Sequence, residues 1–474
     1  MDALADRFAG CLLGAAVGGA FGMPLEFLSR HDIWDIYGGP VVDMLPPGRG
    51  RYNDNTRLMI ALAQAITEAG FPDPYAIADK FAELYRSSGN NRMPGCACIE
   101  ACARLAQGEY WDRAGSDSAD NGAATRIMPI ALMYHGDIGR MLEFAREQSI
   151  ITHKDRRAVE GAQLIALAID YLLDRRDPAF LIDYLLAYAA ADEIKGQLDR
   201  VKRLISEDGV PCKIAEGLGT SGYIVHTLGV ALYSFLKCPD DLAQAVVIAA
   251  NAGGDADGAA CITGALAGAY NGEKAIPPDW LKDLENRGLI EDLARRLYDM
   301  YLVPYKPVPD ILDYGLKAVF IGFNPGLTSA KEGHYYAYPG NHFWKLLYES
   351  GILPEPLSAK EDRRVLEFGY GMVDIVKFPT RSAADITKEQ YRRGRVRLMR
   401  ALAQYRPKLA CYNGKTIYAK LTGEKKVDYG LQPDSAIEEV TDFVAMSSSP
   451  ASAIPYSEKL KCYKELANLL ESVI

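Results

Sequence analysis

The chain has 474 residues, of which 49% are apolar and 24% are charged. Because a domain usually has about 100–200 residues, this length predicts two to four domains, each able to bury its own core. A membrane span needs about 20 consecutive apolar residues. The mean hydropathy of the chain is −0.09, and we expect no membrane span and no membrane partner.

Asp2 and Asp6 stand where a secretory signal would carry basic residues. The nine cysteines follow no regular C-x-x-C pattern, so we expect reduced thiols and a cytoplasmic protein.

The charge is unevenly divided along the chain. Residues 311–474 hold 23 Lys and Arg against 19 Asp and Glu, a balance of +4, whereas residues 1–310 carry −13. Because phosphates favour a positive surface, we expect a nucleic-acid partner on the C-terminal part. Ordinary scatter among solvated side chains explains the same difference, and both interpretations stay open.

Apolar residues recur with helical spacing through the first three hundred residues. The Ala- and Leu-rich stretches at 58–69, 76–85, 158–173, 242–250 and 259–270 predict helices separated by Gly, Pro or Asn. Strand-like alternation is scarce in this part. The sequence therefore predicts an all-α domain over residues 1–303.

Three prolines, Pro304, Pro307 and Pro309, predict a stiff connector over residues 304–310. Beyond it, apolar runs at 317–323, 408–412 and 443–446 are each followed by Gly or Ser and then by a helical stretch. Strands that alternate with helices predict a parallel α/β sheet, whose ligands bind beyond the carboxyl ends of the strands. The second predicted domain covers residues 311–474.

Four polar or Gly-rich segments interrupt the helical part. They are residues 18–26, ending in Glu26, residues 52–56 with Asp54 and Asn55, residues 120–126 with Asn121 and Gly122, and residues 253–257 with Asp255 and Asp257. Oxygen-rich side chains of this kind are the ligands that Mg²⁺ prefers. Any one segment is more often explained by helix capping, but the combination indicates a site.

Over residues 5–275 these segments resemble the ADP-ribosylglycohydrolase family. The matching positions are residues 10–14, Glu26, residues 53–56, residues 121–126, Thr152–His153, and residues 253–257 with 262–268. The resemblance implies an all-α domain that hydrolyses glycosidic links to ADP-ribose with two Mg²⁺ ions in a central cleft.

The resemblance also assigns roles to residues of this chain. It makes Glu26 and Asp54 catalytic, Asp54, Asn55, Asp255 and Asp257 metal ligands, and Asn121, Gly122 and His153 contacts to an ADP-ribose-containing ligand.

Three positions depart from the family pattern. The family has Thr, Asp and Thr where this chain has Asn53, Asn55 and Gly258. Because divalent affinity depends on the number and charge of the ligands, we expect one of the two ions to be weak or absent. Three interpretations stay open: a hydrolase with altered metal use, a domain that binds ADP-ribose without cleaving it, and a scaffold.

The C-terminal part carries three further segments. Asn324 follows the first predicted strand, residues 333–345 are rich in aromatic side chains, and residues 446–452 are rich in serine. A fixed amide can position a water, which suffices to hydrolyse an N-glycosidic bond through an oxocarbenium-like state. The aromatic side chains can sandwich a base and the serines can bind a phosphate. Singly, a turn, an aromatic core cluster and a polar loop explain them as well.

In this order, over residues 309–470, the segments closely resemble the mismatch-specific uracil/thymine-DNA glycosylases. The resemblance implies an α/β/α sandwich of the uracil-DNA glycosylase type, which flips a base out of DNA and cuts its N-glycosidic bond without a metal cofactor, as in base-excision repair. It makes Asn324 the catalytic residue that positions water, with Tyr336 stacked on the base, Asn341 in the pocket, and Ser448 and Ser449 on the DNA backbone.

Two positions depart from this second pattern. Asp374 stands where the family usually carries an Asn that reads the base edge. An ionised carboxylate only accepts hydrogen bonds, so Asp374 favours a base with N–H donors, and guanine-like, cytosine-like or modified edges are conceivable. In the family, one side chain fills the gap that a flipped base leaves in the DNA. That position falls near Ser452 in this chain, and serine is too small to fill the gap. A single-stranded, unstacked or non-polymeric substrate fits both departures.

Both modules handle glycosidic bonds of nucleotides. We therefore expect a hydrolase in which the first module recognises or hydrolyses ADP-ribose and the second excises a base, acting on a nucleobase or DNA site that carries ADP-ribose. Three alternatives stay open: a conventional G·U/G·T mismatch uracil/thymine-DNA glycosylase with a vestigial first domain, a non-catalytic ADP-ribose/DNA sensor, and a hydrolase of free modified nucleosides.

Overall fold

The computed structural model describes residues 2–46, 49–52, 54–88 and 96–473. The chain falls into two compact units, Met1–Leu302 and Val303–Ile474. Asn53, one of the positions expected to weaken the metal site, lies outside the described residues. The cysteines whose side chains are described are all free thiols.

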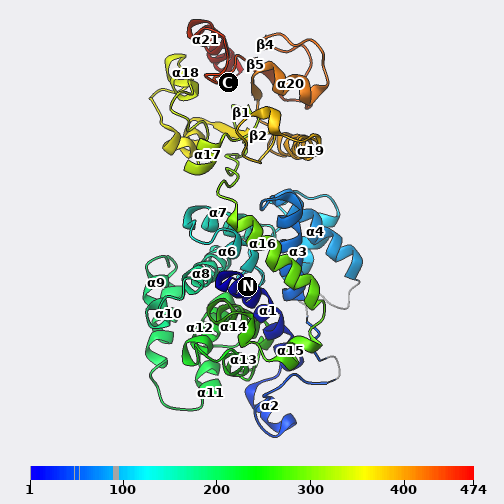
Figure 1. Ribbon diagram of the computed structural model, residues 1–474, viewed down its shortest axis with the longest axis vertical. Helices are drawn as coiled ribbons and strands as arrows, with labels where there is room; N and C mark the ends of the chain where they lie inside the picture. The colour runs from blue at the N-terminus through cyan, green and yellow to red at the C-terminus, as the bar shows by residue number, and fades with distance from the viewer. Residues whose placement is uncertain (1, 47–48, 53, 89–95, 474) are drawn as a thin grey trace. The chain divides into compact units, whose positions relative to one another are not determined.

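The first unit is helical (Figure 1). Its helices are α1 (Ala3–Gly22), α2 (Arg30–Tyr37), α3 (Asp54–Ala69), α4 (Pro74–Ser88), α5 (Cys96–Ala106), α6 (Met128–Met133), α7 (Ile138–Ile150), α8 (Arg156–Leu173), α9 (Leu181–Leu186), α10 (Asp192–Leu204), α11 (Pro211–Glu216), α12 (Ile224–Lys237), α13 (Leu242–Ala250), α14 (Ala256–Asn271), α15 (Pro278–Asp283) and α16 (Arg287–Leu302). Short 3₁₀ turns lie at η1 (Met23–Leu25), η3 (Pro178–Phe180) and η4 (Glu273–Ala275). Every helix expected from the sequence is present, and the all-α prediction for this part is confirmed.

Helices α1 and α14 lie side by side at the centre of this unit (Figure 1). A Cβ atom on Gly14 would lie 2.2 Å from the carbonyl oxygen of Gly264, and one on Gly18 would lie 2.0 Å from that of Ala260. Only glycine permits backbones this close. Because the contacts run in opposite directions along the two helices, the end of α1 meets the start of α14.

Helix α1 corrects one expectation from the sequence. By length and composition alone, the segment Ala3–Leu25, with a mean hydropathy of 1.6, could cross a membrane, although we expected no such segment. However, 89% of that window is buried inside the unit. A helix that is apolar on all sides is typical of a packed core as well as of a membrane, and here it is the central core helix.

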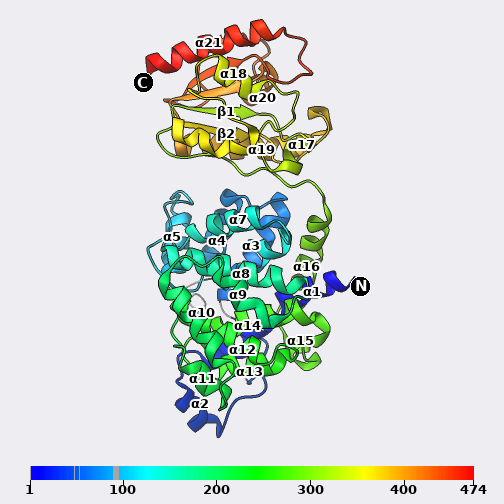
Figure 2. The same cartoon turned by 90° about the vertical axis from the view of Figure 1, so that its left-hand side faces the viewer.

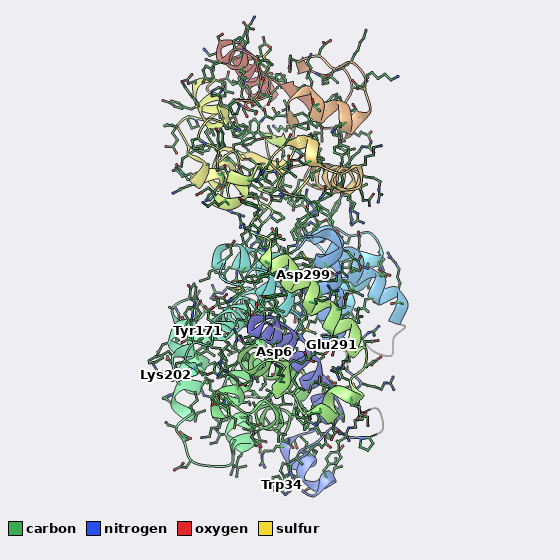
Figure 3. The ribbon with its side chains drawn as sticks, viewed as in Figure 1. Asp6, Trp34, Tyr171, Lys202, Glu291 and Asp299 are labelled. Carbon is green, nitrogen blue, oxygen red and sulfur yellow. The ribbon has the colours of Figure 1, made fainter. Side chains whose placement is uncertain are left out.

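The first unit also carries the negative balance of the chain. Figure 3 shows Asp6 on α1 and Glu291 and Asp299 on the neighbouring helix α16. Asp299 pairs with Arg295 over 3.4 Å, with side chains 61% and 64% exposed. Ion pairs this exposed add little stability, so Asp299 acts mainly as a solvated surface charge.

The second unit is built on one sheet. Its strands are β1 (Ala318–Gly322), β2 (Tyr370–Asp374), β3 (Leu409–Asn413), β4 (Gly430–Leu431) and β5 (Thr441–Ala445), in the order β2-β1-β3-β5-β4. Its helices are α17 (Leu327–Glu332), α18 (Phe343–Glu349), α19 (Lys388–Tyr405), α20 (Lys415–Thr422) and α21 (Tyr456–Val473), with 3₁₀ segments η5 (Ala359–Phe368) and η6 (Ala383–Asp385). Strand β4 pairs antiparallel with β5, and the other pairs are parallel. Strands β1, β3 and β5 match the predicted runs, whereas β2 and β4 were not predicted.

Alternate residues of each strand enter two separate cores. Phe320 of β1 packs in the core that α18 and α21 cover, and its neighbours Val319 and Ile321 pack in the core that α19 and α20 cover. Figure 1 shows α18 and α21 on one side of the strands and α19 and α20 on the other, and Figure 2 shows β1 and β2 in the view turned by 90°. The predicted α/β/α sandwich is therefore confirmed.

The strand order places a crevice at the end of β1. Strand β1 pairs with β2 on one side and with β3 on the other. The chain therefore goes from β1 to β2 on one side of it and then crosses to β3 on the other side. Ligands of such sheets bind beyond the carboxyl ends of the strands at this point. Asp374 and Asn413 end β2 and β3, and Asn324 follows β1 by two residues.

Candidate functional site

Three carboxylates converge in the first unit where α1 ends and α14 begins. Glu26, Asp255 and Asp257 have ligand oxygens that all lie within 4.8 Å of one another. The backbone N–H of Phe27 donates to the carbonyl oxygen of Gly254 over 2.8 Å, which ties the two segments together. Asp255 precedes α14, but its side chain makes no capping hydrogen bond. Helix capping therefore does not explain this carboxylate.

Burial makes these carboxyl groups weak acids. Burial, together with the charges of Asp255 and Asp54, raises the pKa of Glu26 to about 7. Burial also raises the pKa of Asp54 and of Asp255 to about 6, and that of Asp257 well above its usual value. Because a divalent cation would relieve this repulsion and carboxylate oxygens suit a hard cation, the donor set fits a metal ion.

Asn55, which was predicted to bind metal, holds a neighbouring carboxylate. Its Nδ2 donates to Oδ2 of Asp257 over 2.9 Å, and its Oδ1 accepts from the hydroxyl of Thr125 over 2.8 Å. The amide thus orients Asp257 without adding a negative charge to the cluster.

Asn121 and Gly258 both act on Asp255. Nδ2 of Asn121 donates to Oδ2 of Asp255 over 2.5 Å and to the hydroxyl of Thr227 over 2.8 Å. A Cβ atom on Gly258 would lie 2.4 Å from the same oxygen of Asp255, so the glycine makes room for this hydrogen bond and supplies no hydroxyl ligand. Asn121, predicted to contact the substrate, is therefore engaged with the carboxylate cluster.

His153 is fully buried and acts through Asp120, a residue that the sequence did not single out. Burial lowers the pKa of His153, so the ring is neutral. Its Nδ1 accepts from the hydroxyl of Thr152 over 2.7 Å, and its Nε2 donates to Asp120. Arg126 donates to the same Thr152 hydroxyl over 2.6 Å.

Asp120 differs from the other carboxylates of the region. Burial alone would raise the pKa of Asp120, but the hydrogen bond from His153, together with those from Gly122 and Ser118, outweighs that effect and lowers it. The backbone N–H of Gly122 also donates to Asp120, over 3.1 Å. A carboxylate that stays ionised therefore lies close enough to Asp54 and Asp255 to raise their pKa values.

A cavity of about 560 Å³ lies at the carboxyl ends of the strands in the second unit. The residues predicted for this unit all line it, namely Asn324, Tyr336, Asn341, Asp374, Ser448 and Ser449. They come from the ends of β1 and β2, the aromatic segment before α18 and the loop after β5. The structure brings them together as predicted, while their individual roles stay predictions.

The amide of Asn324 has a fixed orientation. Its Nδ2 donates to the carbonyl oxygen of Phe378 over 3.1 Å and to the hydroxyl of Thr380 over 2.8 Å. Thr380 itself donates to the carbonyl oxygen of Ser382 over 2.7 Å, so it can only accept from Asn324. With the nitrogen thus occupied, Oδ1 is the atom of this amide that can accept a hydrogen bond from a water.

Asp374 ends β2 and is only 4% exposed. It is paired in register with Gly322 of β1, where a Cβ atom would lie 2.1 Å from Oδ1 of Asp374. Glycine is therefore required for the carboxylate to lie over the end of the neighbouring strand. Burial raises the pKa of Asp374 to about 6, against the opposing charge of Lys377.

Tyr336 and Asn341 belong to the aromatic segment. Tyr336 has a φ of +52°, and its ring stacks on Phe343 with centroids 3.8 Å apart. Tyr336 also lines the cavity. Oδ1 of Asn341 accepts from the backbone N–H of Phe343 over 3.0 Å, which fixes the other end of this segment.

Ser448, predicted to contact a DNA backbone, is fully buried. It exchanges two hydrogen bonds of 2.9 Å with Asn413, which ends β3 and also lines the cavity. Asn413 was not among the predicted site residues. The signal that could have found it is its position, because a polar residue directly after a buried apolar run marks the carboxyl end of a strand.

Comparison with known proteins identifies both units. Residues 1–307 match the family model of the ADP-ribosylglycohydrolases. The chain belongs to this family. Residues 309–471 match the model of the uracil DNA glycosylase superfamily, which confirms the predicted fusion. Together the two matches support a fusion of glycosyl hydrolase modules.

Several relatives match over the helical unit. An uncharacterized protein of Archaeoglobus fulgidus is 35% identical over 303 residues, which are 63% of this chain and 97% of the relative. ADP-ribosylarginine hydrolase Tri1 of Serratia proteamaculans is 29% identical over 310 residues, 63% of this chain and 80% of the relative. ADP-ribosylhydrolase ARH3 of Xenopus tropicalis is 27% identical over 349 residues, 64% of this chain and 97% of the relative. A solved structure described as an ADP-ribosylglycohydrolase-related protein complex has a TM-score of 0.53 and 29% identity, covering 64% of this chain and all of that chain.

Proposed function

We propose that this chain is an N-glycosyl hydrolase with two sites, in which the second unit excises a nucleobase and the first binds and hydrolyses ADP-ribose. The proposed substrate is a nucleobase or DNA site that carries ADP-ribose. The observation that carries the proposal is the fixed amide of Asn324 in the cavity that also holds Asp374, because a water acceptor and a base reader are the two functions that base excision needs.

Base excision at this cavity needs no strong base. A water that donates to Oδ1 of Asn324 attacks C1′ of the sugar while the bond from C1′ to the base breaks. The electron pair of that bond leaves with the base, and the water proton is released as the new C1′–O bond forms. Because the transition state resembles an oxocarbenium ion, a positioned water is a sufficient nucleophile.

In the first unit, Glu26, Asp54, Asp255 and Asp257 are proposed to hold Mg²⁺. When bound, a divalent ion supplies Lewis-acid stabilisation for cleavage of a glycosidic link. Asn121 orients Asp255, and Asn55 orients Asp257. Asp120, which stays ionised beside the cluster, is suited to accept a hydrogen bond from a ribose hydroxyl.

The test is a substrate panel in which released products are identified by mass spectrometry. The panel contains U·G and T·G duplexes, single strands and ADP-ribosylated oligonucleotides, each with and without Mg²⁺. Base release from the ADP-ribosylated strand should be lost in Asn324→Ala, and release of ADP-ribose should be lost in Asp257→Asn. Release from U·G or T·G alone would instead make the chain a conventional mismatch glycosylase, and no release at all would favour a sensor.

A second candidate for the first unit is ADP-ribose binding without hydrolysis. The Asn55 amide on Asp257 and the missing side chain at Gly258 favour it, because both reduce what the cluster can offer to a second ion. Calorimetry with ADP-ribose and a release assay with an ADP-ribosylated oligonucleotide distinguish the two: a pure binding module keeps its affinity for ADP-ribose in EDTA and releases no ADP-ribose from the oligonucleotide in Mg²⁺.

A further inference from the structure

We propose that the cavity of the second unit selects a base whose edge presents two adjacent N–H donors, as guanine does at N1 and N2, and that Asp374 accepts both. This inference rests on the proposed base-excision function and adds the chemical class of the base.

The position of Asp374 requires donors from a ligand. The residue is 4% exposed and lines the cavity. Among the described residues, the structure shows no group that donates a hydrogen bond to its carboxylate; Arg397 instead donates to its backbone carbonyl oxygen over 3.4 Å. Because a buried carboxylate without donors is costly, a ligand that supplies them gains affinity.

The neighbouring cations engage a different carboxylate. Nζ of Lys377 donates to Oδ1 of Asp310 over 2.7 Å and to the hydroxyl of Tyr335 over 3.2 Å. Arg397 also pairs with Asp310. Two buried cations therefore share Asp310, and the negative charge of Asp374 balances the second of them. Asp374 itself lines the cavity. With a pKa of about 6, this carboxylate is ionised at pH 8.

An ionised carboxylate distinguishes the common bases by their edges. It accepts two hydrogen bonds and donates none. Uracil and thymine flank their N3–H with two carbonyl oxygens, and cytosine and adenine place a lone pair beside their amino group, so each of these edges turns an acceptor toward one carboxylate oxygen. Guanine alone among them offers N1–H beside an exocyclic N–H, which matches both oxygens of Asp374.

The rest of the cavity accommodates a purine. Its volume of about 560 Å³ lies within the usual range for small-molecule sites. Tyr336, which stacks on Phe343, lines the cavity and brings an aromatic ring to it. At the end of β1, Gly322 leaves the space that Oδ1 of Asp374 occupies.

The test compares deoxyguanosine with deoxyinosine, which lacks only the exocyclic amino group. Binding of each nucleoside, and of deoxyuridine, is measured by calorimetry at pH 8 with the full chain. The wild type should bind deoxyguanosine about tenfold or more tightly than deoxyinosine, because one hydrogen bond to a charged acceptor is at stake. Asp374→Asn presents one donor and one acceptor, so it should remove this preference and improve binding of deoxyinosine and deoxyuridine.

Asn324→Ala serves as the matched variant, since it should keep the ratio between deoxyguanosine and deoxyinosine while abolishing base release. Equal binding of the two nucleosides, no binding of either, or a ratio unchanged in Asp374→Asn would overturn the inference. If oligonucleotides still lose bases in an Asn324-dependent manner, the proposed function survives that result. If instead the guanine preference is found but no oligonucleotide loses a base, the inference on the base stands and the proposed excision fails.

Discussion

Nδ2 of Asn55 donates a hydrogen bond to Oδ2 of Asp257 over 2.9 Å, at a position where the ADP-ribosylglycohydrolase pattern carries a second carboxylate. Two carboxylates this close would repel each other unless a cation lay between them. The amide replaces that repulsion with an attraction. The cluster is thereby stabilised in the absence of one cation, which supports a site for a single ion.

Asn55→Asp should therefore increase metal binding. The new carboxylate removes the hydrogen bond to Asp257 and adds a ligand, so we expect a higher Mg²⁺ affinity or a second bound ion, and a lower melting temperature without metal. Calorimetry with Mg²⁺ measures the stoichiometry, with Asn55→Ala as the variant that loses the hydrogen bond but gains no charge. An Asp variant that binds Mg²⁺ as the Ala variant does would contradict the single-ion account.

Stabilisation by Mg²⁺ should depend on pH. Burial raises the pKa of Glu26 to about 7 and those of Asp54 and Asp255 to about 6. Between about pH 4 and 7 the folded chain thus binds more protons than the unfolded chain, and the free energy of unfolding without metal falls as the pH rises. A metal ion competes with these protons and binds only the folded state.

The increase in melting temperature caused by Mg²⁺ should accordingly be small at pH 5.5, grow through pH 6–7 and level off above it. Scanning calorimetry at several pH values measures it, with Asp257→Asn as the control. A shift of equal size at every pH, or one that Asp257→Asn retains, would show that Mg²⁺ acts elsewhere.

Thr380 should matter for base excision through Asn324. Thr380→Val removes the hydroxyl that accepts from Nδ2 of Asn324, while the carbonyl oxygen of Phe378 remains. We expect about tenfold slower release through kcat, against about 100-fold or more for Asn324→Ala. Thr422→Val, whose hydroxyl donates to the carbonyl oxygen of Tyr418, is the matched control outside the cavity. Equal rates for both Thr variants would show that the orientation of the amide is unimportant.

The contact between α1 and α14 should tolerate no side chain. Gly14→Ala places a methyl group on the carbonyl oxygen of Gly264, so we expect a loss of about 2 kcal/mol or more in the free energy of unfolding. Gly196→Ala is the matched control, because it lies in α10 with nothing near its Cβ position and should be neutral or stabilising by about 0.5–1 kcal/mol. Urea unfolding measures both, and similar losses would contradict the packing argument.

The sequence predicted most of the fold because the helical and strand patterns are strong and local. It missed β2, since Tyr370–Asp374 combines a glycine with a terminal carboxylate and shows no alternation. It also treated α1 as unremarkable, although Ala3–Leu25 has the hydropathy of a membrane span. The glycines of this segment are explained only by the partner helix α14. Gly18 lies against Ala260, which is 242 residues later in the chain and far beyond any local window.

The site was predictable only in part. Glu26, Asp255 and Asp257 could be found from their motifs, and the structure brings them together. Asp120 could not be ranked, because its importance comes from a hydrogen bond to His153, which lies 33 residues away in the chain. Asn413 was missed although its position after an apolar run marks it, and its partner Ser448 lies 35 residues away. For the same reason the sequence did not show that Asn121 and Asn55 hold carboxylates.

The measurement that tests the central claim most directly follows abasic-site formation in one oligonucleotide prepared with and without ADP-ribose on a single base. The account predicts faster formation from the ADP-ribosylated strand, with loss of the activity in Asn324→Ala. Equal rates from the two strands, or formation that survives in Asn324→Ala, would contradict it.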